Sequence, residues 1–401
     1  MTTDGDLQTR LWNRNFSLLC ANNLFLYLSF DFLTAALPLY MTQSMHLSKS
    51  TVGVALSAFS FGGILMRPLA GNAVDAVGRK WIFLASMLSF ALLYDSYMLA
   101  STLSAMMVVR FLHGMAWGAT CIAASTAVVD VIPVRQRGLG LGYHGMASSV
   151  ASVFAAAAGL AVANAAGYNA MFVFASALCF VALLLGGAVK YPVCAQRPKV
   201  WRWSQLLEKT SLPVSLNFLI VSLTTGGLTG FVAIYAREKG FVNIGAFFII
   251  SAICGIFSRW IGGIIFNRTG PREVSVAALL MLLFCFPTLV LIPSVMGFYL
   301  AAALYGMGSG ILYLSFQAMV NNLVPPQRRG AANATLFTIL NLGYALGKVL
   351  TGFAADAVGL DRTFLCFSAV NAIALAFFVM YVYKHYLTAA NAAAAMTNAS
   401  Q

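Results

Sequence analysis

The chain has 401 residues, of which 60% are hydrophobic and only 9% are charged, and its formal net charge is +13. A soluble protein of this length needs far more charge to cover its surface, so the composition excludes a soluble globular fold and indicates an integral membrane protein. The sequence has no nucleotide-binding loop, and its seven cysteines show no metal-site or redox spacing. We therefore expect neither an enzyme nor an ATP-driven pump, and we expect no metal and no cofactor.

Apolar runs recur along the whole chain, and each is long enough to cross a hydrocarbon core of about 30 Å as a helix. We predict an all-α membrane protein with twelve transmembrane helices. The predicted spans are 16–41, 50–73, 81–101, 104–130, 138–165, 169–190, 211–236, 243–266, 274–294, 297–324, 330–356 and 363–384. The first span is too long for a removable signal peptide and lacks a cleavage pattern.

The basic residues predict an orientation in the membrane. With the amino terminus placed in the cytoplasm, four of the 24 Lys and Arg residues lie outside and four lie within spans, which leaves sixteen inside. The outer four are Lys49, Arg237, Lys239 and Arg362, and those within spans are Arg67, Arg110, Arg259 and Lys348. This positive-inside bias predicts a multi-pass protein of a bacterial-type inner membrane with both termini cytoplasmic, and it explains the net charge without a nucleic-acid partner.

An internal repeat divides the chain. Adding 192 to the numbers of the stretch 67–80 matches Arg67 to Arg259 and Gly78 to Gly270. The same offset matches Gly114 to Gly306, Gly118 to Gly310, Pro133 to Pro325 and Arg137 to Arg329. We predict two pseudo-symmetric six-helix bundles at 1–190 and 211–387, a cytoplasmic linker at 191–210 and a poorly ordered tail at 388–401. Parallel repeats of this kind predict a solute site between the halves and alternating access.

The loop after the second span carries a motif. It reads Gly71-x-x-x-Asp75-x-x-Gly78-Arg79-Lys80. Gly71 lets neighbouring helices approach closely, and Gly78 supplies a turn conformation. The motif resembles the signature cytoplasmic loop of the major facilitator superfamily, and the resemblance extends over essentially the full length of the chain.

The resemblance implies a conformational latch. In that family the loop holds the cytoplasmic side of the outward-open state closed. Asp75 would dock against the start of helix 11, and the basic pair Arg79 and Lys80 would meet a carboxylate that ends helix 4. Here Asp130 occupies that position and is followed by Arg137. The alternative is a plain positive-inside loop.

Arg110 lies well inside helix 4, where a charge is costly enough to need a partner or a function. The run Arg110-x-x-His113-Gly114-x-x-x-Gly118 resembles the helix-4 motif of the same superfamily, which implies that Arg110 assists proton coupling or substrate contact. His113 shares a helix face with Arg110. The alternative is that Arg110 extends toward the periplasmic headgroups.

Asp31 is the predicted partner of Arg110. Asn23, Tyr27 and Asp31 recur every four residues and form one polar stripe on helix 1. At about 1.5 Å per residue, Asp31 and Arg110 lie at nearly the same depth. The resemblance implies that both helices line the central cavity. There, Asp31 would be protonated or ionised according to which side is open, so we predict that it carries the proton. A static ion pair is the alternative.

We expect the solute cavity to use polar and aromatic side chains at membrane depth. The candidates are Asn23, Tyr27, Asn217, Tyr235, Tyr313, Gln317 and Asn341. The second half has no ionisable equivalent of Asp31, but it is rich in aromatic residues that include Tyr305, Phe337 and Tyr344. This division suits a proton site in one half and an amphipathic or aromatic solute held by the other.

Four further charged residues lie in or near the predicted spans. We expect Asp95 to be structural. Lys348 either extends to the membrane surface or contacts an anion. The repeat symmetry of Arg67 and Arg259 suggests a structural role for both in the latches.

The leading hypothesis is a monomeric secondary transporter, surrounded by lipid, that exports a small organic solute in exchange for protons. The solute would be a drug or an endogenous metabolite such as a metal chelator. Ala155 and Ala156 stand where drug–proton antiporters of the superfamily usually carry Gly-Pro, and this departure weakens antiport. The alternatives are a proton-coupled importer of a sugar or organic acid and a non-transporting membrane sensor.

Overall fold

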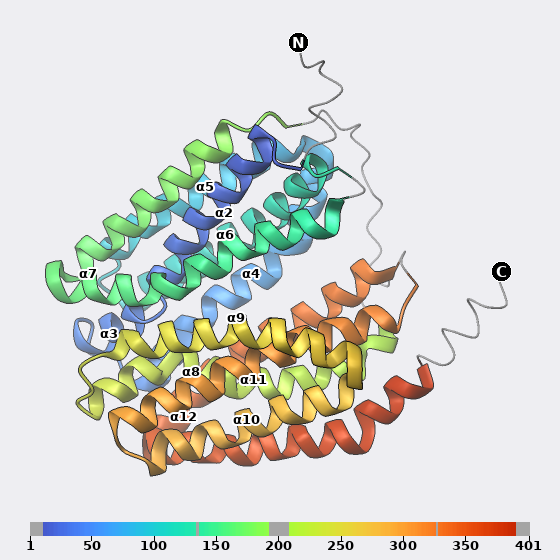
Figure 1. The fold of residues 1–401 in the computed structure, drawn as a ribbon. Helices are drawn as coiled ribbons and strands as arrows, with labels where there is room; N and C mark the ends of the chain where they lie inside the picture. Colours follow the sequence, from blue (N-terminus) through green and yellow to red (C-terminus); the bar gives the residue numbers. More distant parts are fainter. Residues whose placement is uncertain (1–10, 134–135, 192–207, 326–327, 390–401) are drawn as a thin grey trace. The chain divides into compact units, whose positions relative to one another are not determined.

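The computed structural model describes residues 11–133, 136–191, 208–325 and 328–389 (Figure 1). These residues are almost entirely helical and contain no strand. The α-helices are α2 (Arg14–Phe32), α3 (Ala36–Gln43), α4 (Lys49–Val77), α5 (Arg79–Ser96), α6 (Leu103–Val131), α7 (Arg137–Gly187), α8 (Leu212–Glu238), α9 (Ile244–Thr269), α10 (Pro271–Leu291), α11 (Val295–Asn322) and α12 (Arg329–Phe377). Short 3-10 helices at Tyr97–Leu99 and Lys209–Ser211 and a π-helix at Phe378–Val382 complete them.

Two of these helices each contain two membrane-spanning segments. Ten helices within the described residues are long and apolar enough to cross a membrane. However, α7 has 51 residues and α12 has 49, about twice the length that one crossing needs. Each is interrupted by a glycine in the left-handed region, Gly167 with φ 85° and Gly359 with φ 82°. A residue with a Cβ would be strained there. Counting each half separately confirms the twelve predicted segments.

The first predicted span, 16–41, is not one continuous helix. It is divided into α2 and α3, with turns at 33–35 between them. Pro38 has no backbone N–H, so the carbonyl of Thr34 loses its helical partner. The Thr34 N–H itself bonds to the Asp31 carbonyl at 3.0 Å. The break therefore follows directly after the turn that carries Asp31.

The repeat found in the sequence is also a structural repeat. Gly78 and Gly270, 192 residues apart, precede α5 and α10 with φ of 102° and 88°. Thr102 caps α6 by accepting a hydrogen bond from a backbone N–H three residues on, at 3.2 Å. Ser294, again 192 residues later, caps α11 in the same way at 3.1 Å. The two halves thus share turns and caps as well as helix lengths.

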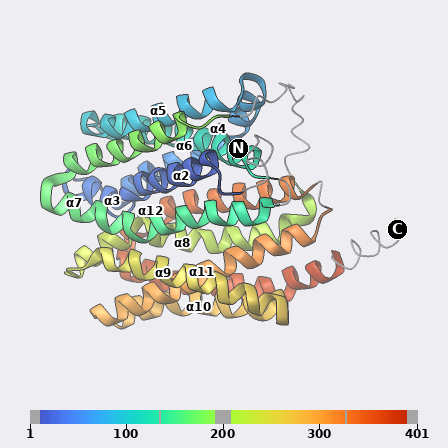
Figure 2. The same ribbon diagram turned by 45° about the horizontal axis from the view of Figure 1, so that its top comes forward.

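The described chain forms two compact units. Unit 1 comprises Met1–His46 and Ala58–Trp201, and unit 2 comprises Leu47–Ser57 and Arg202–Gln401. The first turns of α4 belong to unit 2, and the division into halves at 1–190 and 211–387 stays a prediction. Within unit 1 the largest contact joins α2 to α7, and within unit 2 it joins α8 to α12 (Figures 1 and 2). Most of the predicted linker 191–210 and of the tail 388–401 lies outside the described residues.

Equivalent glycines hold neighbouring helices together in both units. A Cβ at Gly114 of α6 would collide with the carbonyl of Phe59 in α4, and a Cβ at Gly306 of α11 would collide with the carbonyl of Ser251 in α9. Such small residues let two helix backbones touch.

Gly114→Ala should therefore lower the stability of the purified protein, by about 1–3 kcal/mol, because the collision is with backbone that cannot rotate away. The control is Gly142→Ala on α7, where an added Cβ meets no atom of the described residues within 4 Å. That change should be neutral or should stabilise by about 0.5–1 kcal/mol. Thermal unfolding in detergent measures both, and equal melting temperatures would contradict the packing described.

Candidate functional site

Asp31 lies in the last turn of α2, and its carboxylate accepts a hydrogen bond from the hydroxyl of Ser152 on α7. The two helices touch closely here, since Gly159 of α7 packs on the carbonyl of Phe32. Among the described residues, no ion pair involves Asp31. A half-buried carboxylate held by a neutral hydroxyl is thus the main polar feature beside the break in the first span.

The predicted ion pair between Asp31 and Arg110 is not formed within the described part of the chain. Arg110 is buried, and its Nη1 donates to the hydroxyl of Tyr97 at 3.3 Å. Its guanidinium also lies 4.6 Å from the ring centroid of Phe59. The prediction failed because it matched the two residues by depth. Depth does not determine the helix face on which a side chain lies.

His113 joins Arg110 through Tyr97, as a shared helix face predicted. The Tyr97 hydroxyl lies 2.9 Å from His113 Nδ1, so it accepts from Arg110 and contacts the imidazole. His113 is buried, with the rings of Phe90 and Tyr94 at 4.2 and 4.6 Å. No sequence pattern pointed to Tyr97, which belongs to a 3-10 turn, or to Ser152, which stands in a run of small residues.

Three of the seven predicted cavity residues, Asn23, Asn217 and Tyr235, donate hydrogen bonds to backbone carbonyls of other helices. Asn217 and Tyr235 are fully buried, Asn217 donating to the carbonyl of Ala374 and Tyr235 to that of Leu289. In this structure neither side chain is exposed.

Asn23 donates to the carbonyl of His144 at 2.8 Å, and Asn341 donates to the carbonyl of Phe337 on its own helix at 2.6 Å. Tyr27 packs edge-on against Trp117, and Gln317 is half-buried on α11.

Unit 2 contains a cavity of about 140 Å³ that is partly open, and the side chain of Arg259 is exposed in it. It is lined by Phe218, Val221 and Thr225 of α8, Arg259 of α9, Tyr305, Ser309, Leu312 and Tyr313 of α11, and Tyr344 of α12. Of the predicted cavity residues, Tyr313 alone lines this cavity. Arg259, interpreted from the repeat as a latch residue, lies in it too, with its guanidinium 5.2 Å from the ring centroid of Tyr313. The aromatic wall agrees with the tyrosines noted in the sequence, whereas the cation was missed.

The motif loop contains the ion pair that the resemblance implies. The guanidinium of Arg79, at the start of α5, pairs with the carboxylate of Asp130 near the end of α6. Gly78 supplies the turn between α4 and α5. Gly71 does not bring helices together, since no described atom lies within 4 Å of where its Cβ would be.

The remaining residues of the motif are less constrained. Lys80 lies 5.8 Å from the ring of Trp81, and Arg137 is exposed at the first position of α7. The side chain of Asp75 lies outside the described residues.

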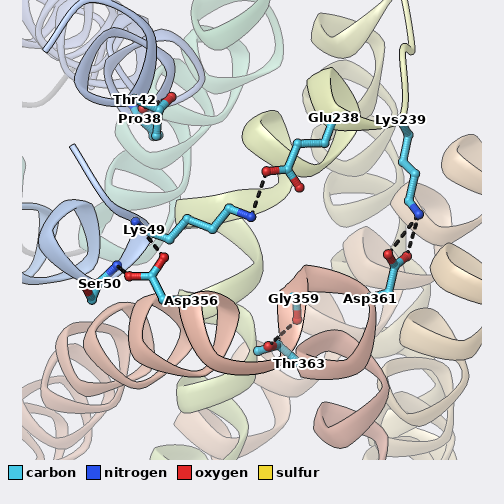
Figure 3. A network of polar contacts seen from close by, with 10 residues as sticks. All are labelled: Pro38, Thr42, Lys49, Ser50, Glu238, Lys239, Asp356, Gly359, Asp361 and Thr363. Atoms are coloured by element: carbon cyan, nitrogen blue, oxygen red, sulfur yellow. Dashed lines mark hydrogen bonds and ion pairs between the residues drawn. The ribbon is translucent and has the colours of Figure 1, made fainter. Parts of the chain in front are cut away.

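At the other end of α4, a polar network fixes its first turn to unit 2 (Figure 3). The carboxylate of Asp356 accepts from the backbone N–H groups of Lys49 and Ser50 at 3.1 and 2.8 Å. The Lys49 ammonium pairs with Glu238 at 2.7 Å.

Asp95 and Lys348 contact neighbouring helices. Asp95 accepts from the Ser176 hydroxyl at 3.0 Å, which joins α5 to α7 and fits the structural role predicted for it. The stem of Lys348 packs against Gly230.

Comparison with known proteins agrees with this fold. The family model of the Major Facilitator Superfamily matches residues 19–347 and 274–399. Multidrug resistance protein 2 of Bacillus subtilis (strain 168) is 25% identical over 361 residues, which cover 84% of this chain and 88% of that protein. An uncharacterized MFS-type transporter of Burkholderia mallei (strain SAVP1) is 24% identical over 396 residues, covering 95% of this chain and 94% of that protein.

Solved structures show the same architecture. A mutant of the nucleoside transporter NupG superposes with a TM-score of 0.79 at 15% identity, over 92% of this chain and 100% of that chain. A bacterial homolog of the human lysosomal transporter Spinster superposes with a TM-score of 0.80 at 16% identity, over 94% of this chain and 98% of that chain. These likenesses establish the fold, and the match to the family model covers most of the chain. The protein belongs to the Major Facilitator Superfamily of multi-pass membrane transporters.

Proposed function

We propose that the protein exports a small organic solute in exchange for protons, by alternating access of its two halves. The observation that carries this proposal is the Asp31 carboxylate, bonded to the Ser152 hydroxyl beside a helix break. A carboxylate paired with a cation stays ionised, whereas one held by a hydroxyl can gain and lose a proton without breaking an ion pair. The likeness to a multidrug resistance protein supports export.

The rest of the cycle follows from the same proposal. With the amino terminus in the cytoplasm, the Arg79–Asp130 pair would lie on the cytoplasmic side and contribute to the latch. The Arg110–Tyr97–His113 cluster would support proton movement near Asp31. We propose that a monomer performs this cycle.

Flux into proteoliposomes tests the proposal. An antiporter accumulates solute when the lumen is acidic, because protons leaving the vesicle drive solute inward. A symporter accumulates it when the outside is acidic. We expect accumulation of fluorescent organic substrates only with an acidic lumen, and its loss when a protonophore is added. Accumulation with an acidic exterior would establish the importer alternative. A rate of solute uptake that does not change with the pH gradient would contradict proton coupling.

A further inference from the structure

Arg259 is a cation in the interior of a membrane-spanning helix. It lies ten residues before the end of α9 at Thr269, which is about 15 Å along the helix axis. No described carboxylate forms an ion pair with it. A charged side chain at such a depth costs several kcal/mol unless a partner or water compensates, and the side chain of Arg259 is exposed, so it is a candidate for contact with a ligand.

The cavity that holds Arg259 is sized for one ring. Its volume of about 140 Å³ is close to the roughly 150 Å³ of an apolar protein cavity that binds benzene. Aromatic side chains form its wall, with Phe218 and Tyr313 edge to face at 6.3 Å between centroids. Flat aromatic groups pack well in such surroundings.

Polar groups gather on the side of the guanidinium. Tyr305 and Tyr344 line the same cavity as Arg259. Phenol hydroxyls and a guanidinium are all hydrogen-bond donors, and a guanidinium matches the two oxygens of a carboxylate in a bidentate arrangement. The part of the cavity lined by Arg259, Tyr305 and Tyr344 therefore suits an anion.

We infer that this cavity is a subsite for a single-ring aromatic carboxylate, with the carboxylate on Arg259 and the ring against Phe218 and Tyr313. The inference rests on the proposed function and names a class of solute for it. Arg259 has no carboxylate partner among the described residues, and the carboxylate of such a ligand would balance its charge.

The first half of the chain supplies a matched control. Arg67 stands 192 residues before Arg259, at the equivalent position of α4. Cys121 stands at the position equivalent to Tyr313, so the aromatic wall is missing there. Removing the Arg67 charge tests the loss of a cation from the same depth without touching the cavity of unit 2.

Equilibrium binding of radiolabelled benzoate to the purified full-length protein in nanodiscs tests the inference. Benzamide, which has the ring without the charge, should compete at least tenfold more weakly than benzoate. Cyclohexanecarboxylate, which has the charge without the aromatic ring, should also compete more weakly. Arg259→Gln should weaken benzoate binding at least tenfold, Arg259→Lys should weaken it less, and Arg67→Gln should leave it unchanged.

Three outcomes would overturn the inference: no benzoate binding by the native protein, equal binding of benzamide, or equal losses in the Arg259→Gln and Arg67→Gln variants. The comparison of competitors uses the native protein, so it decides the matter even if a variant fails to fold. Proton-driven accumulation of neutral or cationic solutes without benzoate binding would refute this subsite and leave the proposed function standing. Benzoate binding without any response of solute flux to a pH gradient would support this subsite and refute the proposed proton-coupled function.

Discussion

Asp31→Asn should reduce proton-driven solute accumulation in proteoliposomes to the level of protein-free vesicles. Asparagine has nearly the same size as aspartate, and its carbonyl oxygen can still accept from Ser152. The amide cannot take up a proton in the accessible pH range, so solute movement is no longer coupled to the gradient. Exchange of labelled for unlabelled solute without a gradient needs no proton, and it should stay within roughly threefold of the native rate.

Asp95→Asn is the matched control for this experiment. Asp95 also accepts a hydrogen bond from a serine of α7, Ser176, so the same substitution is made in the same type of contact. Accumulation should persist in this variant, because Asp95 only joins two helices. Native accumulation by Asp31→Asn would remove that residue from the mechanism. Equal loss in both variants would show that carboxylate–serine contacts matter for folding rather than for coupling.

The fold could be predicted because its determinants are periodic and local. Hydropathy defines the twelve segments, and the fixed offset predicts that both halves turn at equivalent glycines, such as Gly78 and Gly270. Hydropathy could not predict that Gly167 and Gly359 would join neighbouring spans with so short a turn. Pro38 was a sequence signal for the break before α3. A hydropathy average over a sliding window does not detect it, because the average does not depend on the missing N–H of proline.

The site was less predictable, because it depends on which helix faces meet. Depth along a helix follows from residue count, and it brought Asp31 and Arg110 to one level. Rotation about the axis is decided by packing, which directs Arg110 to Tyr97 and Asp31 to Ser152. Arg259 shows the limit of repeat symmetry. Equivalent positions keep the same backbone, but Tyr313 in place of a cysteine changes what surrounds the charge.

Asp356→Ala should loosen the first turns of α4 from unit 2. A side chain that accepts from free N–H groups at a helix start contributes about 0.5–2 kcal/mol, and a negative charge there also favours the helix dipole. Asp356 accepts two such bonds, from Lys49 and Ser50. Its loss should raise hydrogen–deuterium exchange in residues 47–57 about fivefold, which corresponds to roughly 1 kcal/mol.

Asp361→Ala controls for the loss of a carboxylate from the same stretch of α12. Asp361 pairs with Lys239 at 2.8 Å, and the structure gives it no bond to α4 (Figure 3). Exchange in 47–57 should not change in this variant, and equal effects of both substitutions would contradict a specific cap. Residues 47–57 pack with unit 2, but α4 continues into unit 1 from residue 58. The two bonds that Asp356 accepts therefore hold the first turn of α4 within unit 2, and the exchange of residues 47–57 measures how strongly they do so.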